Sequence, residues 1–527
     1  MSDHTAETQS GAEALVRTLI AGGVDTCFAN PGTSEMHFVT ALDRIPGISC
    51  VLGLQENVVT GMADGYFRVT GRPAATLLHC GPGYANGIAN IHNARRAGSG
   101  MLNIVGDHAI PHVAHDSPLT SDVAALVGAT SQWHAFGTSA ERVGLDAARG
   151  LEAAAAGYGQ IASLVLPADV SWSEGGSVAQ PRPPTGPLAP DPEAVRKAAR
   201  TLRSDRKVLI LLGTAAVALP LHPLLAGLAA GTGADLMGSP TIAKISRGRG
   251  RLNLPVVPYP VDDAIARLAP YDALVLVNCP PPVGFFRYPG RPSLLHRPDA
   301  DVVVLSRPDQ DAAVALQALA DELGLAPQAV PAADGELPAV AGAITPASLA
   351  THVARLLPEN ALVVAETITS GIGFPAAMPY AAPVDWIAVT GGAIGGGPPL
   401  ATGAAVGLRA LGQGDRPVIA LQADGSAAYT LQALWTQARE RLPIITLLLN
   451  NRSYAILLGE YQKVGADPGP TARAMMSLDD PAIDWCALAR GFGIDAAEAP
   501  THEALEKAFL NAVKSRRPTL IDVRLFS

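Results

Sequence analysis

The chain has 527 residues, enough for about three domains of ordinary size. Hydrophobic residues make up 48% and charged residues only 16%, which predicts aliphatic cores of the kind found in buried parallel sheets covered by helices. The net charge of -9, and the lack of a basic run with interleaved aromatics, exclude nucleic acid as an expected partner.

Cysteine usage and the N-terminus indicate a cytoplasmic protein. The five cysteines have no C-x-x-C spacing, which argues against a disulfide framework or a zinc site, and we expect all five to be small core residues. The N-terminal MSDHTAETQSG lacks a basic start and an apolar stretch, so it is expected to be a loose tail rather than a signal. The longest apolar window, 208–231, is interrupted by Gly213, Pro220 and Pro223, so no membrane partner is expected.

Two segments rich in Pro, Gly and Ala, 175–192 and 323–346, are predicted linkers. They suggest domains at 1–180, 190–330 and 345–527. Short β-branched runs alternate with helical patterns in each domain, which predicts an α/β protein with three consecutive doubly wound domains and parallel sheets. The clearest strands are expected at 25–30, 49–54, 74–79, 101–106, 207–213, 273–278, 301–306, 362–366, 386–390, 417–422, 444–449 and 519–525, and a helix at 56–70.

The last domain carries the strongest chemical pattern. One expected strand ends before Asp424-Gly425-Ser426, the next ends at Asn450-Asn451, and an apolar helical face lies between them. A helix of about 15 residues and a returning strand of about 7 have similar lengths, near 22 Å, so Asp424 and Asn451 are expected at one carboxyl edge of neighbouring parallel strands. Their oxygens suit Mg²⁺, and a helix starting near Ser426 would favour phosphate. Each pair taken alone also fits an ordinary turn.

Together the two pairs resemble the signature of enzymes that use thiamine diphosphate (ThDP), Gly-Asp-Gly followed by Asn-Asn, with Ala423 in place of the first Gly. The resemblance implies ThDP and Mg²⁺ as cofactors. It also implies metal ligation by the side chains of Asp424 and Asn451 and by the Ser453 carbonyl, and cofactor contacts by Gly425, Ser426 and Tyr454.

Residues 49–87 resemble the pyrimidine-binding domain of the ThDP family that contains acetolactate synthase, benzoylformate decarboxylase and pyruvate decarboxylase. In that family the residue matching Glu56 activates the cofactor, although Glu56 alone could be read as an acid at a helix start. The Gly-rich stretch 390–407 matches a loop in which Gly392 offers a carbonyl to the cofactor and Ile394 bends it. Thr369 matches a position that contacts the diphosphate, as does Ser370.

Three segments are expected to line the substrate pocket by the same resemblance. Thr33 keeps the hydroxyl of a benzoylformate decarboxylase serine that contacts the substrate carboxylate, and His79 matches that enzyme's first catalytic histidine, although Tyr84-Ala85-Asn86 looks more like acetolactate synthase. His115, followed by Asp116, stands where pyruvate decarboxylase has a histidine pair; as a group that titrates near neutral pH it could shuttle protons, or be solvated surface.

Two departures from the family qualify this interpretation. Phe285, Phe286 and Arg287 occupy the region of a second catalytic histidine, and the middle third has no stretch resembling an FAD-binding segment, so FAD is not expected. The family places the residues matching Glu56 and Asp424 on different subunits of one site, which implies a homodimer or homotetramer with active sites at the subunit interface.

The expected function is therefore ThDP- and Mg²⁺-dependent decarboxylation of a small 2-oxo acid, with carboligation of the product as a further outcome. Two alternatives remain open: a ThDP-dependent C–C lyase acting on a 2-hydroxyacyl substrate, and a non-catalytic ThDP-binding partner subunit. Glu56 argues against the second, because a protein that only binds the cofactor has no need of the activating acid.

Overall fold

The computed structural model describes residues 9–526, so most of the N-terminal stretch expected to be a loose tail lies outside the described residues. Three sheets of six, four and seven strands, covered by helices, confirm the expected α/β architecture. The chain divides into two compact units. The first contains residues up to 186 with 391–415 and 430–442, and the second contains 187–390, 416–429 and the residues from 443 onward.

The first unit is built on a parallel six-stranded sheet. Its order is β2 (Ser49–Leu52), β1 (Thr26–Asn30), β3 (Ala74–Leu78), β4 (Met101–Asp107), β6 (Ile161–Pro167) and β5 (Trp133–Phe136). β5 and β6 were not among the strands expected from the sequence. Around the sheet lie the helices α1 (Gly11–Ala21), α2 (Met36–Arg44), α3 (Glu56–Thr70), α4 (Cys80–Ala97), α5 (Val123–Thr130), α6 (Ala140–Ala154) and α7 (Ala168–Trp172).

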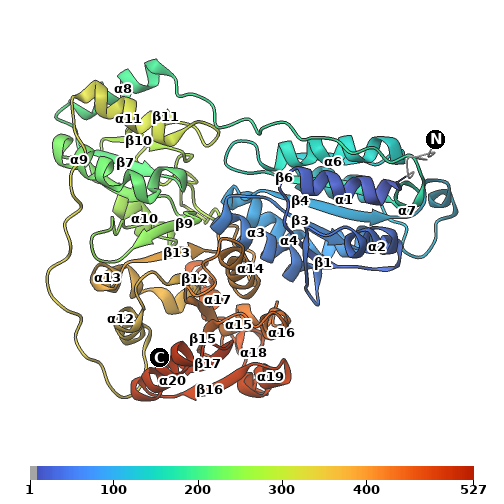
Figure 1. Ribbon diagram of the computed structural model, residues 1–527. Coiled ribbons are helices and arrows are strands. Elements are labelled where there is room, and N and C mark those ends of the chain that lie inside the picture. The colour runs from blue at the N-terminus through green and yellow to red at the C-terminus, as the bar shows by residue number, and fades with distance from the viewer. Residues whose placement is uncertain (1–8, 527) are drawn as a thin grey trace. The chain divides into compact units, whose positions relative to one another are not determined.

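Helices cover both faces of this sheet (Figure 1). One face forms a core with α1, α2 and α6, in which Leu15, Phe38 and Val143 are fully buried. α3 and α4 pack on the opposite side, as the doubly wound expectation required. The carboxyl ends of the strands are where such sheets bind ligands.

Helix α3 coincides with the expected helix and shows why its sequence is helical. Its first turn is capped by Gln55, whose side chain accepts hydrogen bonds from the backbone N–H groups of Asn57 and Val58, and it ends at Gly71 with φ of 68°. α14 (Gly397–Ala410) packs closely against α3. A Cβ on Gly65 would lie 2.0 Å from the Leu400 carbonyl oxygen, so the glycine permits the close approach of the two helices.

The second unit contains two sheets. The four-stranded sheet has the order β11 (Asp301–Ser306), β10 (Ala273–Val277), β7 (Val208–Leu212) and β8 (Asp235–Gly238), all parallel. The seven-stranded sheet has the order β16 (Asp495–Ala499), β17 (Thr519–Arg524), β15 (Ile444–Asn450), β14 (Val418–Ala423), β12 (Leu362–Glu366), β13 (Val384–Ala388) and β9 (Lys244–Arg247). β9 is antiparallel to β13, so this sheet is mostly rather than wholly parallel.

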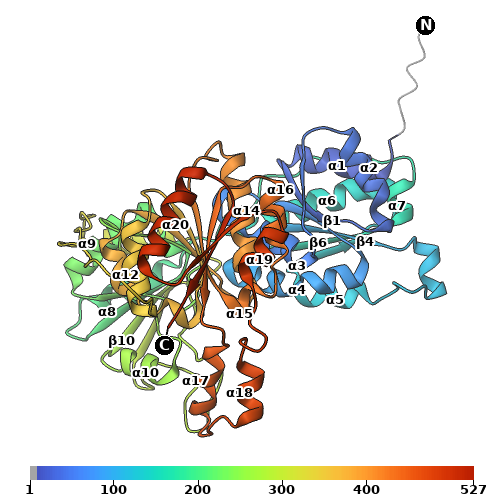
Figure 2. The ribbon, with the colours of Figure 1, turned by 90° about the horizontal axis from the view of Figure 1, so that it is seen from below.

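Helices also cover the sheets of the second unit. They are α8 (Pro192–Leu202), α9 (His222–Thr232), α10 (Val261–Leu268), α11 (Ala312–Leu323), α12 (Pro346–Leu356), α13 (Phe374–Ala377), α19 (Trp485–Gly491) and α20 (His502–Ser515). Figure 2 shows α17 (Ala455–Lys463) and α18 (Pro470–Met476) side by side, following the Asn450-Asn451 turn. Among the helices of the described chain, none is long and apolar enough to cross a membrane.

Two expectations need correction. The helix after Asp424 was expected to be continuous, but it is a single turn, α15 (Asp424–Ala427), followed by an irregular stretch and a short α16 (Ala433–Arg439). A one-turn helix has a small dipole, so the phosphate attraction expected near Ser426 is correspondingly weak. Of the five cysteines, Cys50 is exposed, because it lies on the edge strand β2, while the other four are buried.

Candidate functional site

The residues singled out in the last domain meet at the carboxyl edge of two neighbouring strands. β14 and β15 pair in parallel, with Ala423 opposite Leu449, so both chains leave the sheet at the same edge. Asp424 is 2% exposed there, and its Oδ2 accepts a 2.7 Å hydrogen bond from the backbone N–H of Arg452. The geometric premise drawn from the sequence, that Asp424 and the Asn-Asn turn converge, agrees with this contact.

The turn after β15 presents several oxygens. The Asn451 Oδ1 accepts the Ser453 N–H at 3.0 Å, and the Ser453 hydroxyl donates to the Met476 carbonyl at 3.2 Å. Arg452 between them has φ of 55°, an uncommon conformation for a residue with a side chain. The turn is therefore held in a defined shape rather than left as an extended loop.

Asp424 is a buried carboxylate that forms no ion pair with any cationic side chain of residues 9–526. Its Oδ1 accepts the Gly425 N–H at 2.9 Å. Burial nevertheless raises the pKa of Asp424 to about 6, against the lowering effect of its backbone hydrogen bonds to Gly425 and Arg452. A divalent cation would supply the missing positive charge, and carboxylate, amide and carbonyl oxygens are the donors Mg²⁺ prefers. The donor set therefore fits a magnesium ion carrying a diphosphate.

Tyr454 packs over the same turn. A Cβ on Gly425 would lie 2.5 Å from Tyr454 Cε1, so only glycine lets the ring lie there. The neighbouring strand β12 ends at the same edge of the sheet, and a short 3₁₀ helix, Ile368–Gly371, follows it. In this helix Thr369 is exposed and Ser370 is buried. Ser426 is buried in α15. These residues lie where the sequence expected contacts to the diphosphate.

Glu56 starts α3 in the first unit. It is 9% exposed, and its Oε2 accepts a 3.0 Å hydrogen bond from the side chain of Asn86 on α4. α4 passes very close to it, since a Cβ on Gly83 would lie 3.1 Å from Glu56 Oε1. The acid is thus enclosed, and the Asn86 amide anchors it.

The glycine-rich loop around Gly392 is fastened to α4. The carbonyl of Gly391 meets His92 Nε2 at 3.0 Å, and the carbonyl of Ala393 accepts from the Asn93 side chain at 2.8 Å. Gly392 itself is exposed with φ of 80°, and Ile394 is half-buried. The loop is therefore held on both sides of the residue whose carbonyl the sequence assigned to the cofactor.

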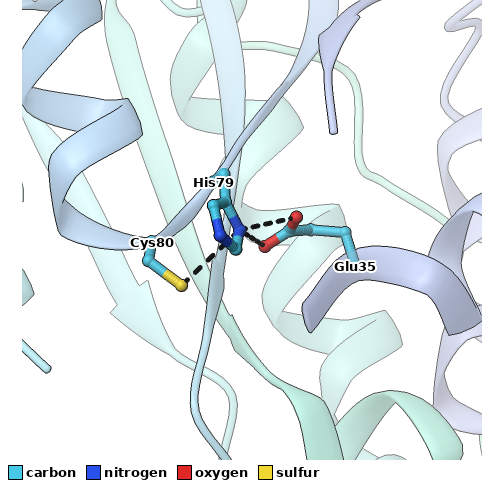
Figure 3. Close-up of side chains that lie close together, drawn as sticks. All are labelled: Glu35, His79 and Cys80. Carbon is cyan, nitrogen blue, oxygen red and sulfur yellow. Dashed lines mark hydrogen bonds and ion pairs between the residues drawn. The ribbon is translucent and has the colours of Figure 1, made fainter. Parts of the chain in front are cut away.

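His79, at the end of β3, is surrounded by groups the sequence did not single out (Figure 3). Its Nδ1 lies 3.0 Å from both carboxylate oxygens of Glu35 and 3.3 Å from the Ser34 hydroxyl. Cys80 Sγ is 3.7 Å from the same nitrogen. Thr33, which was expected to meet the substrate carboxylate, is exposed at the start of the 3₁₀ turn, and the hydroxyl that lies against His79 is that of Ser34.

Two clusters in the described residues have donor atoms close enough to hold a metal ion, and they share Cys80. One contains Glu35 and His79; the other contains Asp107 and His108. In the first, the Glu35 carboxylate already accepts from Gly32, Ser34 and His79. These hydrogen bonds account for the first cluster without an ion.

His115 ends a row of histidines. It lies in an exposed 3₁₀ turn, Ile110–His115, with its ring 5.7 Å from that of His112, which in turn stacks 5.9 Å from His108. His108 belongs to the cluster around Cys80. His115 is therefore linked to His79 through His112, His108 and Cys80, rather than by direct contact.

Glu35, Ser34 and Cys80 were not among the site residues expected from the sequence, and Asn86 was named only as part of a motif. Ser34 and Cys80 adjoin residues that were named, but nothing in the spacing indicates that Glu35 reaches a histidine 44 positions later. A carboxylate two residues after Thr33 was visible, whereas its partner is brought to it only by the pairing of β1 with β3.

Comparison with known proteins defines the class. The profile of the thiamine pyrophosphate enzyme N-terminal TPP-binding domain matches residues 9–126, and that of the C-terminal TPP-binding domain matches residues 369–523; together they cover just over half of the chain. The chain belongs to the thiamine diphosphate enzyme family, which confirms the resemblance found in the sequence.

Relatives in this family align over nearly the whole chain. A Mycobacterium tuberculosis protein whose name places it among acetolactate synthase large subunits (IlvX) is 45% identical over 518 residues, 98% of each chain. Benzoylformate decarboxylase of Pseudomonas aeruginosa is 27% identical over 95% of this chain and 96% of its own. The structure of a 4-hydroxybenzoylformate decarboxylase from Rhodococcus jostii RHA1 superposes with a TM-score of 0.84 at 24% identity, covering 98% and 99% of the two chains, and this shows the shared fold.

Proposed function

We propose that this ThDP-dependent enzyme decarboxylates a small 2-oxo acid in the presence of Mg²⁺ and can pass the product to a second carbonyl. The observation that carries the proposal is Glu56, a carboxylate enclosed at the start of α3 and anchored by Asn86, in a chain whose full length aligns with decarboxylating and carboligating relatives. The substrate is a small molecule, and the reaction takes place in the cytoplasm.

ThDP, when bound, supplies a carbanion that adds to a carbonyl carbon and then accepts the electrons released with carbon dioxide. The chain's part is to activate and orient it. Glu56 would exchange a proton with the bound cofactor, the Gly392 carbonyl would accept a hydrogen bond from it, and Ile394 would help to orient it. The fastening of residues 391 and 393 to α4 supports this role of the loop, because a positioned acceptor needs a rigid backbone.

Asp424, Asn451 and the Ser453 carbonyl would hold Mg²⁺, and Thr369, Gly425, Ser426 and Tyr454 would contact the diphosphate. The support is the uncompensated buried carboxylate of Asp424 and the oxygen donors of the turn beside it. Cofactor affinity should therefore depend on the metal, and EDTA should abolish the heat of ThDP binding measured by calorimetry.

Thr33, His79 and His115 serve the substrate pocket: Thr33 meets the carboxylate, and the histidines move protons. Since the activating acid and the metal site belong to partner subunits in this family, the working enzyme is a homodimer or homotetramer. Sedimentation of the chain with ThDP and Mg²⁺ tests this, and a species of one chain that retains full activity would contradict it.

The function is tested by carbon dioxide release from pyruvate, benzoylformate, 4-hydroxybenzoylformate and branched 2-oxo acids, with ThDP and Mg²⁺ present. The decisive variant is Glu56→Gln, which keeps the shape and the Asn86 hydrogen bond but cannot exchange a proton. We expect cofactor binding to change little and turnover to fall at least about 100-fold. Glu141→Gln, an exposed acid on α6, is the matched control.

Other outcomes would replace the proposal. Cleavage of a 2-hydroxyacyl substrate without release of carbon dioxide from any 2-oxo acid would make the chain a C–C lyase. Metal-dependent cofactor binding without turnover of either class would indicate a non-catalytic ThDP-binding subunit. Undiminished turnover in Glu56→Gln would remove the role assigned to that acid.

A further inference from the structure

Glu35 is almost inaccessible to solvent, yet it carries a carboxylate. It is 1% exposed, and it lies at the end of the 3₁₀ turn that follows β1. Two donors already meet its two oxygens, the Gly32 N–H at 2.6 Å and the Ser34 hydroxyl, and His79 Nδ1 lies 3.0 Å from both oxygens. This arrangement suits an ionised carboxylate, which only accepts hydrogen bonds.

Such an arrangement decides where the imidazole carries its proton. A neutral histidine has one N–H and one acceptor nitrogen, and the nitrogen facing an ionised carboxylate must be the donor. Within the described chain, the polar groups that contact the ring all lie against Nδ1; they belong to Glu35, Ser34 and Cys80. The proton therefore lies on Nδ1, and Nε2 keeps a lone pair.

The surrounding backbone fixes the position of both side chains. A Cβ on Gly32 would lie 2.2 Å from the Cγ atom of His79, and a Cβ on Gly106 would lie 1.7 Å from Glu35 Oε1. The His79 ring and the Glu35 carboxylate thus occupy the space that a side chain at position 32 or 106 would fill. A polar pair closely packed on two glycines is held in one orientation.

Cys80 does not compete with Glu35 for charge. Its thiol lies 3.4 Å from the Ser34 hydroxyl, and burial raises the pKa of Cys80 to about 11, so the thiol stays neutral. Among the described groups that contact His79 Nδ1, Glu35 alone carries a carboxylate, since the others are a hydroxyl and a thiol. It is therefore the group that stabilises the ring when it is protonated.

The pair also lies beside the activating acid. A Cβ on Gly83 would be 3.3 Å from His79 Cβ and 3.1 Å from Glu56 Oε1, so both residues border the same turn of α4. His79 is partly accessible, with 22% of its side chain exposed, while Glu35 behind it is enclosed. The ring thus stands between a buried carboxylate and the region of the proposed reaction.

We infer that Glu35 is a positioning residue, which fixes the tautomer and orientation of His79 so that Nε2 transfers the proton of the reaction. The inference rests on the proposed function. Decarboxylation of a 2-oxo acid to an aldehyde breaks the C–C bond to the carboxylate and consumes one proton. His79 first takes a proton from water on Nε2, gives that proton to the substrate-derived carbon and so returns to the neutral form with Nδ1–H, while Glu35 keeps the Nδ1 proton in place.

The test is Glu35→Gln, which keeps the size of the side chain and reverses one hydrogen bond. If the glutamine oxygen stays on the Gly32 N–H, its NH₂ faces Nδ1 and donates to it, which moves the ring proton to Nε2. A carboxylate that orients a catalytic histidine typically contributes several orders of magnitude, so kcat should fall roughly 10²–10⁴-fold with KM nearly unchanged. Asp146→Asn, a buried carboxylate on α6, should leave both constants unchanged.

Two further measurements distinguish positioning from a merely structural role. In a His79→Ala background, Glu35→Gln should add less than about a twofold loss, because a residue that acts through His79 has nothing left to position. Long-range ¹H–¹⁵N spectra of histidine-labelled chain without cofactor, with His79 assigned by its absence in His79→Ala, should show Nδ1–H in the unmodified protein and Nε2–H in Glu35→Gln.

The ring measurement is made on the unmodified chain, and Nε2–H there would overturn the inference. So would a full additional loss in the His79→Ala background, or activity of Glu35→Gln within about threefold of the unmodified enzyme. A chain that releases no carbon dioxide but shows Nδ1–H on His79 would refute the proposed function and still support the hold of Glu35 on the ring.

Discussion

Asp424 should make the metal-free protein less stable as the pH rises. Burial raises its pKa from the ordinary 3.8 to about 6. Because the folded-state pKa lies above the unfolded one, the contribution of this group to stability is full below about pH 4 and is lost as the pH rises through about 6. At about 1.4 kcal/mol per pKa unit, the ionised carboxylate costs the folded chain on the order of 3 kcal/mol at neutral pH.

The difference between the unmodified chain and Asp424→Asn isolates this effect. Both are freed of ThDP and metal, and their thermal midpoints are measured from pH 4 to pH 8, so that the other carboxyl groups cancel. Asparagine leaves either the Gly425 or the Arg452 N–H group without an acceptor, which lowers the thermal midpoint of the variant by an amount that does not depend on pH. On top of that offset, the variant should gain about 5 °C on the unmodified chain between pH 4 and pH 7.5, because about 3 kcal/mol acts on a unit of roughly 300 residues.

A midpoint difference that stays level over this range would refute the account of Asp424 as an uncompensated buried charge. A difference that falls as the pH rises would mean that a cation already neutralises the carboxylate in the metal-free chain. Adding Mg²⁺ and ThDP should reverse the trend in the unmodified chain alone, because the metal binds the ionised form.

Two further predictions concern packing and reactivity. Gly65→Ala should destabilise the chain by roughly 1–3 kcal/mol, because the new methyl group would meet the Leu400 carbonyl between α3 and α14. Gly459→Ala in α17 has open space around it and should be neutral or slightly stabilising. Equal denaturation midpoints for the two variants would contradict this prediction. In the native protein one thiol, that of Cys50, should react rapidly with Ellman's reagent, because the other four cysteines are buried. The rapid reaction should be lost in Cys50→Ser. Rapid reaction of a second thiol would show that one of the four buried cysteines is accessible.

The alternation of strands with helices and the ThDP signature could be predicted from the sequence because both depend on residues that are close together in the chain. Runs such as VLILL and IITLLL are apolar throughout, as strands buried on both faces must be, and they became β7 and the start of β15. Gln55 and Gly71 delimit α3 by their own conformational preferences, so its expected bounds were correct. Asp424 and Arg452 met because a crossover of that length brings both strand ends to one edge.

The long helix expected after Asp424 was wrong, since spacing of leucines does not show whether the backbone between them stays helical. In the first unit the Thr430 hydroxyl donates to the Gly395 carbonyl, a contact between distant segments that stabilises the irregular stretch before α16. β5 and β9 were missed for a similar reason, because short edge strands carry a weak hydrophobic signal and are defined by the neighbour they pair with.

The sequence by itself therefore determined the family, the thiamine diphosphate cofactor and the α/β class, all of which depend on neighbouring residues or on recurring motifs. Only the tertiary structure decided which side chains surround His79. Glu35 and His79 are 44 positions apart, and they meet because β1 and β3 lie side by side in the sheet and because Gly32 and Gly106 leave room for both. Hydrogen bonds between such groups depend on distances of a few tenths of an ångström, which no pattern of residue types records.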